Sequence, residues 1–90
     1  MYSYGDGFDR YMKFSKDNNE KNTIELQNII RERMFNFLNA SPLNTQKLIL
    51  THTGIPSNIL TKWKYNKPDG YKLWYGSAGQ ILLFLEDRGF

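Results

Sequence analysis

The chain has 90 residues, a formal net charge of +3 at pH 7 and no cysteine. This length fits one domain with a modest core, and the lack of cysteine excludes disulfides and thiolate metal sites. With one histidine, no signal-peptide pattern and no apolar run longer than "ILLFL" at 81–85, we expect a cytoplasmic protein without a metal, a cofactor or a membrane span.

The charge is distributed unevenly along the chain. Residues 1–20 carry three basic and four acidic side chains, a net of −1, whereas residues 47–72 carry five lysines against Asp69 alone, a net of +4. A local surplus of this kind indicates an anionic partner, although a solvated lysine surface is the common origin of any single cluster.

Residues 1–22 are predicted to be an N-terminal arm and linker. The end of this segment, "SKDNNEKN" at 15–22, is polar and rich in turn residues. Before it, Phe8, Tyr11 and Met12 have a helical spacing that allows one or two short turns. Because five of the first fourteen residues are aromatic, we expect the arm to dock on its own domain or on a partner.

Residues 23–90 are predicted to form the folded domain, beginning with two helices. Apolar residues in "TIELQNIIRERMFNFLNA" recur with a helical period, with Thr23 as the N-cap and Pro42 as the stop. A second helix of about two turns begins after Thr45. Gly54 ends it, because the residue after a helix often adopts the left-handed conformation that glycine tolerates.

The apolar period restarts directly after Gly54. Pro56 suits a first helical turn, and Ile59, Leu60 and Trp63 form the next apolar stripe. Gly54 is therefore a corner between two short helices, which is the helix-turn-helix arrangement.

The connector after this unit allows two interpretations. Pro68-Asp69-Gly70 predicts a turn, and the aromatic segments on either side could pair as a hairpin over 63–75, which would make a winged helix. We favour an irregular loop, because Trp63 continues the helical spacing. We expect both Trp63 and Trp74 to lie in the core.

A last helix is predicted to begin at Ser77 and to close at Gly89. It contains "ILLFL", which is apolar on more than one face, so the helix is either central to the core or partly an interface. The predicted fold is all-α, with four or five helices.

The segment "TQKLILTHTGIPSNILTKWKYNKP" resembles the lambda-repressor-like, or Cro-type, helix-turn-helix family of phage and bacterial regulators. That family begins its second helix with Thr/Ser-Gln, here Thr45-Gln46, and turns at Gly-Ile, here Gly54-Ile55. The likeness covers about residues 24–88. Three features depart from the family. Leu50 stands where the family prefers a small Ala. Lys64 replaces an acidic residue, with no matching arginine evident on the first helix, and Asn66 replaces the Gly that often ends the recognition helix.

The resemblance implies sequence-specific binding of double-stranded DNA by a transcriptional regulator, such as a repressor, from a phage or mobile element. In such a reader the recognition helix lies in the major groove. Its exposed side chains would contact bases, namely Ser57, Asn58, Thr61 and Lys62. The expected phosphate contacts are Gln46, Lys47, Lys64 and Lys67.

We expect the working unit to be a homodimer, paired through the last helix. No arrangement of residues indicates an enzyme. The alternative is a protein-binding module of a mobile element that inhibits or recruits a host protein through the N-terminal arm or the aromatic residues of 65–75.

Overall fold

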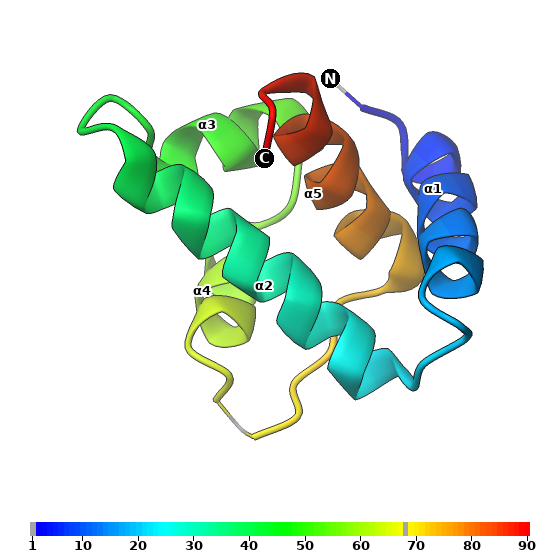
Figure 1. Cartoon of the computed structure of the whole chain (residues 1–90). Coiled ribbons are helices and arrows are strands. Elements are labelled where there is room, and N and C mark those ends of the chain that lie inside the picture. The colour runs from blue at the N-terminus through cyan, green and yellow to red at the C-terminus, as the bar shows by residue number, and fades with distance from the viewer. Residues whose placement is uncertain (1, 68) are drawn as a thin grey trace.

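The computed structural model describes residues 2–67 and 69–90, which form five helices (Figure 1). They are α1 (Tyr4–Asp17), α2 (Thr23–Ala40), α3 (Gln46–Thr53), α4 (Ser57–Lys64) and α5 (Tyr75–Asp87). No strand occurs among these residues, so the all-α prediction is confirmed and the winged alternative is wrong. Pro68 of the predicted turn lies outside the described residues.

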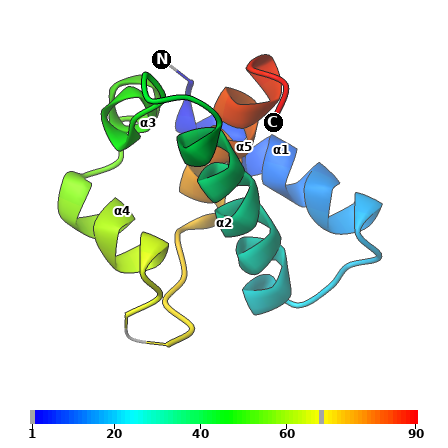
Figure 2. The same cartoon turned by 60° about the vertical axis from the view of Figure 1, so that its left-hand side comes forward.

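Helix α5 is the central helix of the core. It packs against α1, α2 and α3 (Figures 1 and 2). Ile81, Leu82, Phe84 and Leu85 are completely buried. Because these four side chains are covered within one chain, they leave little of the apolar surface through which two copies were expected to pair. The helix also begins earlier than predicted, so Ser77 lies in its first turn.

The N-terminal segment forms a longer helix than its spacing indicated. α1 has 14 residues, and the side chain of Ser3 accepts a hydrogen bond from the main-chain N–H of Asp6 as its N-cap. Tyr11 and Phe14 are buried and belong to the core. The expected arm is therefore docked along α5 of its own domain.

Helix α2 closes the core from the side opposite α1. Its buried side chains include Leu26, Ile30, Met34 and Phe37. The N-cap is Asn22 instead of Thr23, because the Asn22 side chain accepts the N–H of Glu25 at 2.9 Å. The loop containing Pro42 then turns the chain into α3 (Figure 2).

Candidate nucleic-acid interface

Helices α3 and α4 meet at the predicted corner. Gly54 has a φ of +74°, in the left-handed region, and its N–H donates to the carbonyl of Leu50. The predicted glycine stop is thus confirmed, and a side chain here would strain the turn. Ile55 lies 5% exposed behind the corner, which anchors the turn to the core.

The inner face of α4 is anchored by two completely buried side chains, Leu60 and Trp63. The four predicted base-contacting residues are all exposed on the other side of this helix: Ser57, Asn58, Thr61 and Lys62. An eight-residue helix with one buried and one polar face presents these side chains together to solvent.

One hydrogen bond joins the two helices across their exposed surface. The amide nitrogen of Gln46, at the first position of α3, donates to the hydroxyl of Thr61 at 3.3 Å. This bond brings one predicted phosphate contact beside one predicted base contact. Thr45 makes no side-chain cap, so the first turn of α3 is left open next to the polar face of α4.

The predicted phosphate-contacting lysines differ in their surroundings. Lys47 and Lys67 are exposed. Lys64 is half-buried, and its ammonium lies 5.9 Å from the ring centroid of Phe35 on α2 and 5.2 Å from that of Tyr65. Cation–π attraction favours this position, so Lys64 has less freedom to reach outward than the other two.

One arginine of the preceding helix contacts the end of α4, although Lys64 leaves it no acidic partner there. Arg31 on α2 lies with its guanidinium carbon 4.9 Å from the Trp63 ring centroid, and its Nε donates to the Trp63 carbonyl at 2.7 Å. A cation at the C-terminal end of α4 is favoured by the helix dipole. Partial burial lowers the pKa of Arg31.

Gln27 on α2 holds the end of α4 and the connector together. Its side-chain oxygen accepts the indole N–H of Trp63 at 2.9 Å and the main-chain N–H of Leu73 at 2.8 Å, and its amide donates to the Leu73 carbonyl at 2.8 Å. All five atoms are buried, so they need these partners. Composition and periodicity gave no sign of this role, since Gln27 counts as polar in a helical pattern.

The connector between α4 and α5 is irregular, and it exposes one tryptophan. Asn66 has a φ of +53°, and its side chain accepts the N–H of Gly70 at 2.9 Å. Trp63 is in the core as expected. Trp74 is 78% exposed, so its predicted burial is wrong. The reason is that Gln27 directs the side chain of the neighbouring Leu73 inward, and successive side chains of an extended segment point to opposite sides.

The structure also bears on a metal site, on a role for His52 and on a membrane-spanning helix. Within residues 2–67 and 69–90, no group of three or more His, Asp or Glu side chains is placed to hold a metal ion. His52 lies near the end of α3, with its ring centroid 5.5 Å from that of Phe84. None of the helices described here combines the length and apolar content needed to cross a membrane.

No protein-family model, curated protein or solved structure matches the chain significantly. The resemblance to the lambda-repressor-like family therefore rests on segment 45–68 alone.

Proposed function

We propose that the protein binds double-stranded DNA sequence-specifically through α3 and α4. The observation that carries this proposal is the bond between Gln46 and Thr61. This bond holds the uncapped first turn of α3 beside the polar face of α4. One helix can then contact the DNA phosphates while the other contacts base edges.

In this proposal α4 enters the major groove with its exposed face toward the bases. The amide of Asn58 can pair with adenine through two hydrogen bonds, and the ammonium of Lys62 can donate to O6 and N7 of guanine. Ser57 and Thr61 supply hydroxyls that donate or accept.

The backbone contacts come from the residues around this helix. The amide of Gln46 and the main-chain N–H groups at the start of α3 would approach one phosphate. Lys47 and Lys67 are exposed and contribute charge. Lys64 would have to leave the rings of Phe35 and Tyr65 to reach a phosphate, so we assign it the weakest contact.

We further propose that the protein acts on DNA as a homodimer, as a repressor-type regulator would. One short helix reads only a few base pairs, which is too little to find a site among many competitors. Two copies on half-sites about 34 Å apart would double the number of base pairs that are recognised. Since the largest apolar side chains of α5 are buried within one chain, we expect the pairing to use another surface.

The test is DNA binding across a salt series, followed by selection of preferred sites from random duplexes. We expect one enriched motif with two-fold symmetry, and an affinity that falls with added salt. The control is a variant with Asn58→Ala and Lys62→Ala, both exposed, which should fold normally and select no motif. Binding without any preferred motif would contradict the proposal.

A second candidate function is suggested by another observation. Trp74 is 78% exposed and Tyr4 is 51% exposed, and neither belongs to the α3–α4 surface. Large aromatic side chains of this kind are typical of protein interfaces. The alternative function is therefore a protein-binding module, and a DNA-binding regulator could also carry such a surface.

A further inference from the structure

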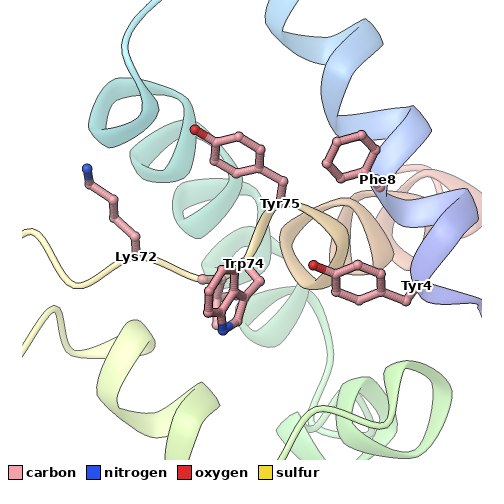
Figure 3. Close-up of a pocket in the computed structure, with 6 residues that line it drawn as sticks. Tyr4, Phe8, Lys72, Trp74 and Tyr75 are labelled. Carbon is pink, nitrogen blue, oxygen red and sulfur yellow. The ribbon is translucent and has the colours of Figure 1, made fainter.

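An aromatic hollow lies between the start of α1 and the start of α5, apart from the α3–α4 surface (Figure 3). It has a volume of about 560 Å³ and is lined by Tyr4, Phe8, Lys72, Leu73, Trp74 and Tyr75. The N-terminal aromatics and the connector aromatics, which are far apart in the sequence, thus form one concave site. We call it the aromatic hollow.

Two of the rings that line the aromatic hollow, Tyr75 and Tyr4, are held in place before anything binds. The ring of Tyr75 stacks on the buried ring of Tyr11, with centroids 4.6 Å apart and planes 10° apart. The Tyr75 hydroxyl is 3.1 Å from the hydroxyl of Thr23. Tyr4 packs so closely on Gly76 that a methyl group there would overlap its ring. A preformed site loses little entropy on binding.

The charge that lines the aromatic hollow is positive. Lys72 is the only charged residue among those that line it, and no carboxylate lines it within the described part of the chain. Tyr75, which lines the hollow, is the first residue of α5, a 13-residue helix whose first turn has no side-chain cap. Its unpaired N–H groups favour a negative group, as does Lys72.

We propose that the aromatic hollow binds a segment of a partner protein in which a large apolar side chain stands next to an acidic residue. The apolar side chain enters between the rings of Trp74, Tyr4 and Phe8. The neighbouring carboxylate meets Lys72 and the start of α5. A few buried aromatic anchors carry most of the affinity of a protein interface, while the exposed Lys72 contributes to the choice of partner.

Two other occupants fit the chemistry less well. A nucleic-acid strand needs several cations along its backbone, and the aromatic hollow has one. A second copy of this chain would offer Leu43, which is 83% exposed. The surrounding segment 39–47 has no acidic residue and carries Lys47, so it would not complement Lys72.

The test is selection of displayed random peptides on the wild-type protein, with peptides that also bind the Trp74→Ala variant removed. We expect the enriched peptides to share an aromatic or leucine side chain next to Asp or Glu. A synthetic peptide of that consensus is then titrated by calorimetry. Trp74→Ala and Phe8→Ala should weaken its binding about tenfold or more, and Lys72→Glu should weaken it several-fold.

Matched controls separate this surface from the rest of the molecule. Tyr65 is 59% exposed but does not line the hollow, so Tyr65→Ala should leave peptide affinity unchanged. Lys62→Ala should also leave it unchanged, while DNA binding responds to Lys62→Ala and not to Trp74→Ala. The circular dichroism of each variant confirms that it folds.

Three results would overturn the proposal. The first is a selection that yields no peptide dependent on Trp74, or only basic peptides. The second is a single-stranded oligonucleotide that binds the protein and loses affinity on Trp74→Ala. The third is self-association that disappears with Trp74→Ala in sedimentation, which would assign the hollow to a second copy. None of these results bears on DNA binding by α4.

Discussion

Gly7 on α1 and Gly79 on α5 are in direct backbone contact, and a methyl group on either would overlap the main chain of the opposite helix. This contact lets the two helices approach closely enough for Tyr11 and Phe14 to enter the core. The glycines therefore decide whether the N-terminal segment is part of the domain.

We predict that Gly79→Ala destabilises the protein, because the added methyl group pushes α1 away from α5. The cost should be about 1–3 kcal/mol, which is typical of overpacking, and urea unfolding measures it. Gly5→Ala is the matched control, since nothing lies within 4 Å of a methyl group there. Replacing an exposed helical glycine should stabilise the chain by about 0.5–1 kcal/mol. Equal effects of the two substitutions would contradict the tight crossing.

Removal of the Gln27 amide should destabilise the protein through the groups that it leaves unpaired. In Gln27→Leu the indole N–H of Trp63 and both main-chain groups of Leu73 lose their partner. Buried polar groups without a partner cost about 1–3 kcal/mol. Denaturant unfolding gives the free energy, and Asn36→Ala, an exposed position on the same helix, is the control. Gln27→Leu with wild-type stability would mean that water replaces the amide.

Lys62 and Lys67 should respond differently to truncation if the DNA proposal is right. Lys62→Ala removes a base contact, so it should cost about 1–3 kcal/mol on the preferred site and relax specificity at one position. Lys67→Ala removes a phosphate contact, so it should weaken binding to all sequences alike and reduce the salt slope by about one unit. Mobility-shift titrations on matched and scrambled duplexes measure both. If both variants lost the same DNA affinity on every sequence, the lysines would contribute only nonspecific attraction to DNA.

The docking of α1 should weaken in acid. The guanidinium of Arg10 holds the Glu86 carboxylate through two bonds, of 2.6 and 2.9 Å, and this lowers the pKa of Glu86. A carboxyl group with a lowered pKa in the folded state adds stability above its unfolded pKa, about 4. That stability is lost as the pH falls below this value.

Glu86→Gln should remove this part of the pH dependence. The effect at pH 7 should not exceed about 1 kcal/mol, because the pair is partly exposed. Thermal unfolding of the wild type and Glu86→Gln between pH 7 and pH 3 should converge in acid. Glu32→Gln, an exposed position on α2, should follow the wild type throughout. A constant difference between the wild type and Glu86→Gln at all pH values would rule out the ion pair as its cause.

Local patterns were enough to predict the elements between residues 23 and 66. Pro42 and Gly54 each end a helix through their own backbone dihedral angles, so these helix ends can be predicted without knowing the rest of the fold. The exposure of α4 followed from its apolar stripe for the same reason. The sequence indicates Gln46 as a contact residue, but its bond to Thr61 depends on how the two helices cross.

Features that depend on long-range contacts could not be predicted in this way. Helix α1 is stabilised by α5, which lies about 70 residues away, and its own sequence contains Gly5 and Gly7, which lower its intrinsic helix propensity. The exposure of Trp74 depends on the distant Gln27. The aromatic hollow combines both effects, because its walls come from two ends of the chain.

The two tryptophans of this protein lie in opposite environments, and this gives the molecule two intrinsic spectroscopic reporters. Trp63 is completely enclosed, whereas Trp74 is largely in water. Iodide should therefore quench the red-shifted emission of Trp74 and leave the blue-shifted emission of Trp63 nearly intact. Occupation of the hollow would protect the first signal, and loss of the core would change the second. One unlabelled sample can thus distinguish binding from unfolding in a single titration.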